Sequence, residues 1–274
     1  MEHPKLLIVD WVNFLLAPLL GPLLAPFGLH GSPDHPLIPP HIVMTMLIVL
    51  AVTILGLVMR SRLSVENPGK VQILLEDGLS AMARILEEWI PGKGRRYMPL
   101  LVALFLFILL SNYSGLVPGL MAPTSVLSTT VGLAITAWVY YHFQGIRAQG
   151  IKSYLLHFAA PPGAPLWMAP IMLPIELISH MSRVMSLSLR LFGNIFGEEL
   201  VIFVLFSLIP FFVPLPMMML GLVTGGLQAF IFVLLTTIYL AGAVAVEHHD
   251  EHEHHDAPHD DRVDVGQGHA AATA

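Results

Sequence analysis

ELISHMSRVMSLSLRLFGNIFGEELVIFVL, residues 176–205, is long and apolar enough to cross a bilayer, yet it carries five formal charges. A charge near the middle of a membrane helix costs about 2.5–3.5 kcal/mol on insertion scales, so such groups usually face protein or water and usually serve a function. At about 100° per residue, one face of this helix gathers charged, hydroxylated and small side chains. That face comprises Glu176, Ser179, Arg183, Ser186, Arg190, Gly193, Asn194 and Gly197. It is suited to contact water or another helix rather than lipid.

The whole chain has the composition of a membrane protein. Of its 274 residues, 55% are hydrophobic and only 12% are charged, whereas soluble domains carry about twice that charge. Several apolar runs reach bilayer length, which predicts a polytopic, all-α integral membrane protein. The chain has no cysteine, so neither a disulfide nor a thiolate metal site is available. Because no basic patch lies outside the short loops, we expect no nucleic-acid partner.

Five transmembrane helices are predicted, and the last two are expected to form a long, tilted helical hairpin within a membrane domain at residues 41–246. The spans cover about residues 41–59, 98–116, 126–143, 168–209 and 217–246. At about 1.5 Å per residue, the fourth span is too long to cross upright, so it should tilt or break near Pro174. Residues 145–167 are predicted to form a polar connection that contains Gly and Pro.

Three further segments are predicted to lie outside the bilayer core. Residues 68–90 place apolar side chains at helical spacing among charged ones, which predicts an amphipathic helix along the membrane surface. Residues 1–40 combine an apolar start with repeated prolines and no clear cleavage site, which predicts an outer segment with a short interfacial helix. Residues 247–274 are acidic and His-rich but have no fixed ligand spacing, which predicts a disordered cytoplasmic tail rather than a metal site.

The basic residues predict the orientation of the chain in the membrane. Nine of the thirteen Lys and Arg residues lie in two loops on the same side of the predicted bilayer: Arg60, Arg62, Lys70, Arg84, Lys93, Arg95, Arg96, Arg147 and Lys152. The opposite loops, residues 111–125 and 210–216, have none. By the positive-inside rule, the N-terminus lies outside and the C-terminus lies in the cytoplasm. Arg183, near the cytoplasmic end of its span, is interpreted as a snorkelling anchor.

Arg190 has two interpretations: a structural partner of a glutamate on a neighbouring helix, or a fixed cation lining an ion path. Because arginine stays protonated, it would repel cations and attract carboxylates without relaying protons itself. Glu198 and Glu199 lie farther toward the outer side, where a buried carboxyl group can bind and release protons. On an ideal helix Glu198 lies about 80° from Arg190 and Glu199 about 180°, which favours Glu198. Glu176, about 21 Å toward the cytoplasm, is assigned to a separate inner cavity.

Two amide side chains complete the candidate site. Gln228 lies in the fifth span and is predicted to face the fourth. Gly221, Gly225 and Gly226, also in the fifth span, permit close contact between the two helices. Asn112, near the outer end of the second span, is predicted either to hydrate an entrance or to cap the following loop.

Four stretches carry a resemblance to a known family. They are NPGKVQ at residues 67–72 with Glu76, SNYSGLVPG at 111–119, LSLRLFGN at 187–194 and GLVTGGLQAFIFVLLTTIYL at 221–240. With these, the chain resembles subunit a of the F-type ATP synthase membrane sector, in a bacterial or chloroplast-like form. The resemblance covers most of the chain, and the combination of LRLFGN with a glutamine-bearing last helix is highly specific.

The resemblance implies a role for each candidate residue. Arg190 would separate two aqueous half-channels, with Gln228 facing it and with Asn194 and Glu176 at polar channel positions. Glu199 would be the outer proton relay, at a position where family members carry an acid or a histidine.

This sequence departs from the family pattern at two positions. Glu198 stands where many members have glycine, and Gly221 stands where some bacterial members have a histidine. We expect Glu199 to be the principal relay, with Glu198 assisting it through like-charge repulsion.

The implied function is that of a stator subunit in a bacterial inner membrane. Its implied partners are the rotating c-ring, peripheral-stalk subunit b, the lipid bilayer and, indirectly, the soluble F1 ATPase. No phosphate-binding loop of the G-x-x-x-x-G-K-[ST] type is present, so we expect neither a catalytic site nor a cofactor in this chain. The alternatives are a self-contained secondary transporter, for which the sequence lacks an internal repeat, and a metal-storing anchor, which would rest on the tail alone.

Overall fold

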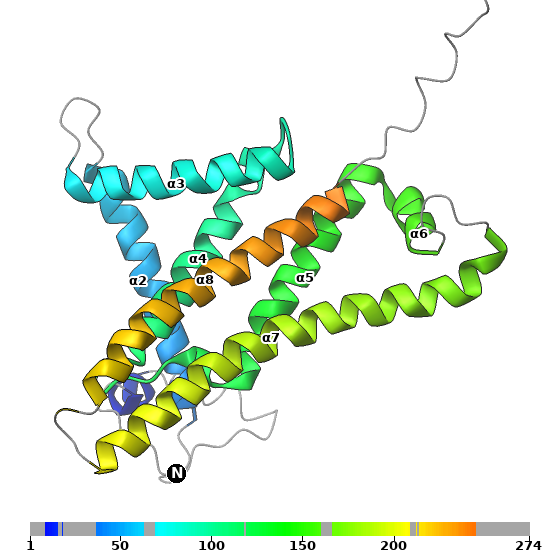
Figure 1. The fold of residues 1–274 in the computed structure, drawn as a ribbon. Helices are drawn as coiled ribbons and strands as arrows, with labels where there is room; N and C mark the ends of the chain where they lie inside the picture. The colour runs from blue at the N-terminus through cyan, green and yellow to red at the C-terminus, as the bar shows by residue number, and fades with distance from the viewer. Residues whose placement is uncertain are drawn as a thin grey trace, which may run out of the picture.

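The structure, a computed structural model, describes residues 9–15, 18, 37–62, 69–117, 119–159, 166–208, 212 and 214–244. Within these ranges the chain is built from helices joined by short turns, without a β-strand (Figure 1). The α-helices are α2 (Pro40–Arg62), α3 (Lys70–Trp89), α4 (Met98–Ser114), α5 (Leu127–Gln149), the short α6 (Ile151–Ala159), α7 (Ala169–Leu208) and α8 (Pro214–Val244). Short 3-10 turns lie at η2 (Gly94–Arg96), η3 (Pro123–Ser125) and η4 (Leu166–Met168). Residues 9–15 are also helical, as expected for an N-terminal helix.

The all-α membrane class is confirmed. Three of the described helices, α2, α7 and α8, are long and apolar enough to cross a membrane. Helix α4 is equally apolar but has 17 residues, and α5 has 23 residues with more polar positions. A described helix thus overlaps each predicted span, while residues 209, 245 and 246 of these spans and the predicted tail at 247–274 lie outside the described residues.

The segment predicted to be a polar connection, residues 145–167, is partly helical. Helix α5 extends to Gln149, and α6 covers Ile151–Ala159. Gly150 separates these two helices with φ 84°, a left-handed conformation that glycine adopts without steric cost. The sharp turn at this one glycine lets a second helix begin immediately.

Helix α7 does not break at Pro174, contrary to one of the two expectations for it. It is a single helix of 40 residues that contains the proline, about 60 Å long at about 1.5 Å per residue. Because Pro174 lies in the second turn, its missing N–H removes only the bond to residue 170. The helix instead runs obliquely, antiparallel and side by side with α8 (Figure 1), as expected for the tilted hairpin.

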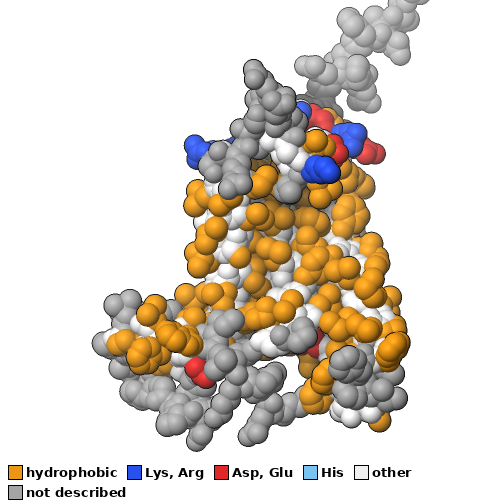
Figure 2. All heavy atoms as spheres, turned by 90° about the vertical axis from the view of Figure 1, so that its left-hand side faces the viewer, with side chains coloured by type: hydrophobic (Ala, Val, Ile, Leu, Met, Phe, Trp, Pro, Cys, Tyr) orange, Lys and Arg blue, Asp and Glu red, His pale blue; other side chains and the backbone are white. Residues whose placement is uncertain are grey.

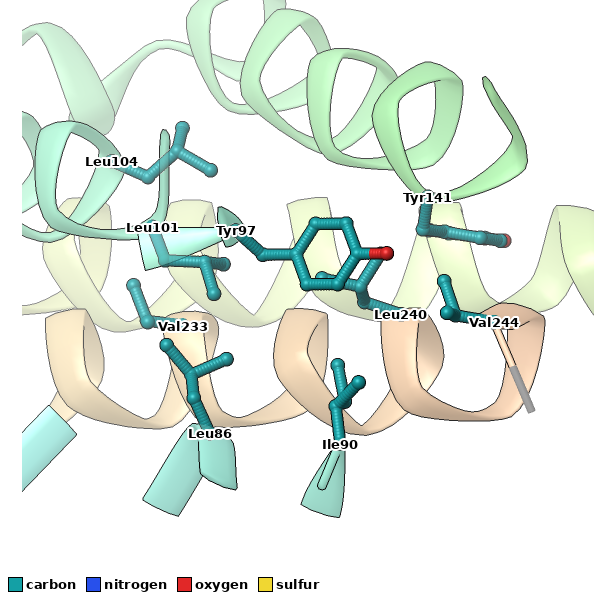
Figure 3. Packing of buried hydrophobic residues seen from close by; sticks show 9 residues of the cluster. All are labelled: Leu86, Ile90, Tyr97, Leu101, Leu104, Tyr141, Val233, Leu240 and Val244. Carbon is teal, nitrogen blue, oxygen red and sulfur yellow. The ribbon is translucent and has the colours of Figure 1, made fainter. Parts of the chain in front are cut away.

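Helix α8 lies at the centre of the packing. One buried cluster joins it to α3, α4 and α5 through Leu86, Ile90, Tyr97, Leu101, Leu104, Tyr141, Val233, Leu240 and Val244 (Figure 3). A second joins it to α4, η3, α5 and α7 through Ile108, Ala122, Ala134, Ala137, Leu187, Leu191, Ile195, Ala229 and Phe232. Alanines in the second cluster let the helices approach closely, which favours association where lipid removes most of the hydrophobic driving force.

Helix α3 lies across one end of the other helices, as predicted for the amphipathic surface helix (Figure 1). Leu86 and Ile90 on its inner side are buried against the core, whereas Leu74 is 73% exposed. Figure 2 shows that, on the face in view, hydrophobic side chains cover the middle of the molecule and charged side chains, both basic and acidic, gather at the end where α3 lies. An apolar middle with a charged end is the pattern expected of a protein that crosses a bilayer.

The close packing of α5 predicts a contrast between two of its glycines. A Cβ at Gly145 would lie 2.6 Å from the Tyr154 ring and 2.9 Å from the Ala243 carbonyl oxygen, whereas a Cβ at Gly132 would meet nothing within 4 Å. We expect Gly145→Ala to destabilise the protein by about 1–3 kcal/mol through overpacking. Gly132→Ala should be neutral or stabilising by up to about 1 kcal/mol. Thermal unfolding in detergent measures both, and equal midpoints would contradict the packing of α5 against α8.

Candidate functional site

The two adjacent glutamates of α7 face different neighbours. Glu198 Oε2 accepts a hydrogen bond of 3.0 Å from the Thr224 hydroxyl of α8. Glu199 Oε1 accepts a hydrogen bond of 3.1 Å from the backbone N–H of Ala122, immediately before η3. Both carboxyl groups are thus held by protein groups, one within the hairpin and the other against the end of α4 and η3.

Gly221 makes room for Glu198. A Cβ at this position would overlap Glu198 Oε1, and Leu116 closes the remaining space. Glu198 and Gly221 are the two departures from the family pattern that the sequence contains, and the structure brings them into contact. In the position that it holds, the carboxyl group therefore occupies the space that a side chain at residue 221 would take.

Glu199 occupies a similarly tight place. A Cβ at Gly115, just after α4, would lie 2.7 Å from Glu199 Oε1 and 2.9 Å from the Ala122 Cβ. The carboxyl group therefore fits between the C-terminal end of α4 and the turn that precedes η3. This placement agrees with the helical angle that puts Glu199 on the side of α7 away from Arg190.

Arg190 lies on the exposed face of α7. Its Nη2 is 3.4 Å from the Ser186 hydroxyl one turn earlier on the same helix. Among the residues that the structure describes, no carboxylate lies within ion-pair distance of it. The guanidinium is therefore available to a partner outside this chain, and no structural pairing with a glutamate is present in the described part.

Asn194 and Gln228 hold the middle of the hairpin together. Asn194 Nδ2 donates a hydrogen bond of 2.8 Å to Gln228 Oε1. Gln228 is 2% exposed, and its Nε2 is buried without a hydrogen-bond partner among the described residues. This link lies one turn of α7 beyond Arg190 and fixes α8 behind the exposed face.

Asn112 joins three elements. Its Nδ2 donates to the Gly225 carbonyl of α8 at 2.9 Å, and its Oδ1 accepts from the Thr124 hydroxyl of η3 at 2.8 Å. The residue is buried. Its side-chain nitrogen and oxygen are both hydrogen-bonded to protein groups, so neither lines an open entrance. Of the two interpretations of Asn112, this geometry favours the structural one.

Glu176 belongs to a second polar cluster, near the other end of α7. Its Oε1 lies 3.2 Å from His180 Nε2, and His180 Nδ1 lies 2.9 Å from the Tyr141 hydroxyl of α5. The ring of His142 on α5 lies 4.7 Å from that of His180, and its Nδ1 is 2.6 Å from the Tyr154 hydroxyl of α6. The cluster forms a chain of groups that can donate and accept protons.

Nearby, Arg183 lies over the Tyr239 ring, with its Cζ 5.2 Å from the ring centre. This stacking of a guanidinium on an aromatic face is a cation–π contact. Arg183 therefore contacts α8, a contact that its interpretation as a snorkelling anchor did not include.

The histidines of this cluster were not among the sequence candidates. The spacing of Glu176 and His180, four residues apart, places both on one helix face and was a usable local signal. The contributions of α5 and α6 had no such signal, because they depend on how helices distant in sequence pack. At about 1.5 Å per residue, Glu176 and Glu198 lie about 33 Å apart along α7, with Arg190 between them.

The fold and the site define an all-α integral membrane protein with ionisable groups along a tilted helical hairpin. Residues 42–241 match the family model described as ATP synthase A chain. The chain therefore belongs to the ATP synthase A chain family, which confirms the resemblance seen in the sequence motifs.

Individual relatives agree with the family match. The chain is 43% identical to ATP synthase subunit a 1 of Syntrophotalea carbinolica over 208 residues, covering 76% of this chain and 87% of that protein. It is 40% identical to ATP synthase subunit a of Syntrophobacter fumaroxidans over 249 residues, 90% of this chain and 100% of that protein. The Campylobacter jejuni subunit a is 50% identical over 154 residues, 56% of this chain and 67% of that protein.

The bonds of Asn112 predict a mainly structural effect of its removal. Asn112→Ala should leave the Thr124 hydroxyl and the Gly225 carbonyl without this partner, at a cost of about 1–3 kcal/mol for a buried polar group. Thr136→Val is the control, because that hydroxyl bonds only to Gly132 on the exposed side of its own helix. Thermal unfolding and hydrogen exchange at η3 measure the effect. Unchanged stability with lost proton conductance would instead assign Asn112 to the ion path.

Proposed function

We propose that this chain is the ion-translocating stator subunit of an F-type ATP synthase membrane sector. It provides two aqueous half-channels, separated by Arg190, that load and unload protons on the carboxylates of a rotating c-ring. Proton flow is thereby coupled to ATP synthesis. The observation that carries the proposal is the position of Arg190, exposed and without a carboxylate partner among the described residues, between two polar clusters on α7.

Arg190 acts by electrostatics rather than by proton transfer. Its guanidinium stays protonated in any surroundings, so it cannot carry a proton between the half-channels. A ring carboxylate about 4 Å away interacts with it by roughly 4 kcal/mol at an effective dielectric constant near 20. This interaction favours the ionised carboxylate at the crossing point, where the ring must release its proton, and it opposes a direct leak.

The outer half-channel is assigned to the glutamate end of the hairpin, with Asn194 at its polar boundary and Asn112 holding α4, η3 and α8 together around it. Glu199 takes up a proton from the outer side and Glu198 assists it. The contacts of Glu199 with the turn before η3 support access from that end rather than through the exposed face of α7.

The inner half-channel is assigned to Glu176, and the structure supports adding His180 and Tyr141 to it. A proton released by the ring would leave along this cluster toward the cytoplasm. Gln228, hydrogen-bonded to Asn194, holds α8 behind Arg190 and keeps the exposed face of α7 in place.

The membrane setting and the partners follow from this assignment. In this proposal the chain lies in a bacterial inner membrane with its N-terminus outside and its C-terminus in the cytoplasm, an orientation that the basic loops favour. The exposed face of α7 meets the c-ring, subunit b of the peripheral stalk holds this chain still, and the soluble F1 ATPase carries out the ATP chemistry. Each charge that crosses 100 mV contributes about 2.3 kcal/mol to that chemistry. Family membership favours this function over a self-contained transporter.

Replacing Arg190 should abolish ATP-driven proton pumping in membrane vesicles while leaving the complex assembled, because its side chain is exposed and bonds to a hydroxyl on its own helix. Arg190→Ala, Arg190→Gln and Arg190→Lys should all fail, since lysine differs in hydration and geometry. Arg147→Gln in the last turn of α5 is the control and should pump normally. Normal pumping by Arg190→Ala would refute the half-channel assignment.

The two adjacent glutamates should differ in their effect on conduction. Glu199→Gln should reduce passive proton conductance severely, at least tenfold, whereas Glu198→Gln, an equally conservative change next to it, should reduce it only mildly. The measurement is proton flux through vesicles stripped of the soluble ATPase. The opposite ranking would make Glu198 the principal relay.

A further inference from the structure

A basic cavity lies where α3 meets the turn that follows it. Its volume is about 730 Å³, and its polar lining consists of Ser80, Arg84, Glu87, Lys93, Arg95 and Arg96. We propose that this cavity binds the phosphate group of an anionic phospholipid. The inference rests on the surface position of α3 and is independent of how protons cross the membrane.

The charge of the cavity is strongly unbalanced. Four of its side chains are cations and one is a carboxylate, and in the part of the chain that the structure describes none of the four forms an ion pair. The carboxylate of Glu87 accepts a hydrogen bond of 2.6 Å from the backbone N–H of Gly92. It therefore holds the turn in place, and the basic groups remain available to an external anion.

The turn that carries the cations is fixed to the end of α3. Gly94 is buried, and a Cβ there would lie 2.6 Å from the Leu86 carbonyl oxygen, so the backbone of the turn lies directly on the helix. The N–H of Tyr97 bonds to the Gly94 carbonyl at 3.0 Å, and the Tyr97 ring is buried in the core cluster. Arg95 and Arg96, between these two anchors, are exposed and held on a fixed backbone, which lowers the entropic cost of binding.

The surroundings match a lipid headgroup better than a free anion. Trp89, at the end of α3, is 48% exposed, and tryptophan is typical of the boundary between bilayer and water. On the face shown in Figure 2, charged side chains, basic ones among them, border the apolar middle of the molecule at this end. A phospholipid whose phosphate group lies in the cavity would therefore have its acyl chains beside an apolar surface. Clusters of Lys and Arg near the membrane surface attract anionic lipids.

The test uses the purified, complete ATP synthase in nanodiscs of phosphatidylcholine with phosphatidylglycerol. The variant Arg95→Gln/Arg96→Gln removes two exposed cations from the cavity. Arg147→Gln/Lys152→Gln removes two exposed cations at the corner between α5 and α6, outside the cavity, and serves as the matched control. Native mass spectrometry measures lipid retained by each complex, and titration with short-chain phosphatidylglycerol measures affinity.

We expect the wild type and the control to retain phosphatidylglycerol in preference to phosphatidylcholine. At the usual contribution of a basic residue near an anionic surface, the cavity variant should bind phosphatidylglycerol about 30-fold more weakly. Equal affinity in the cavity variant and the control would overturn the proposal. Full displacement of phosphatidylglycerol by millimolar inorganic phosphate would also overturn it, because that result would identify a free-anion site. Loss of a stalk subunit from the cavity variant with lipid binding unchanged would overturn it too, because that result would identify a protein interface.

Discussion

Ionisable side chains on an apolar helix must be matched by protein groups or water, and this constraint governs the arrangement around α7. Glu198 is matched by Thr224, Glu199 by the backbone of Ala122, and Glu176 by His180. Arg190 is the exception among the described residues of this helix, since its hydrogen-bond partner is the Ser186 hydroxyl on its own exposed face. The unmatched cation makes the exposed face of α7 unsuited to lipid and suited to an anionic partner.

The hairpin can meet this constraint because α8 approaches α7 and α4 very closely. Gly221 leaves space for a carboxylate, and Gly225 offers its carbonyl to the buried amide of Asn112. The bond between Asn194 and Gln228 then fixes the two long helices relative to each other beside Arg190. Glycine positions, buried amides and the exposed cation thus form one connected arrangement, and a side chain added at Gly221 would displace the Glu198 carboxyl group.

Much of this structure could be predicted from local patterns in the sequence. Apolar runs located the helices, helical spacing located the amphipathic α3, and helical angle placed Glu199 away from Arg190. Local patterns failed where the outcome depends on packing between distant segments. Pro174 was compatible with a break, but its place in the second turn lets α7 continue. The cluster of His180 with Tyr141 could not be found, because it requires the contact between α5 and α7.

The central claim is that the Arg190 face of α7 meets the rotor ring, and site-directed cross-linking tests it most directly. The chain has no cysteine, so a single cysteine can be introduced at Gly193 on the exposed face of α7. A cysteine at Gly132 on α5 is the control. A Cβ at either position would meet nothing within 4 Å. A disulfide requires Cα atoms closer than about 7 Å. In coupled complexes with a cysteine beside the ring carboxylate, Gly193→Cys should cross-link to the ring and Gly132→Cys should not. Absence of the link at residue 193, or equal links at both positions, would contradict the claim.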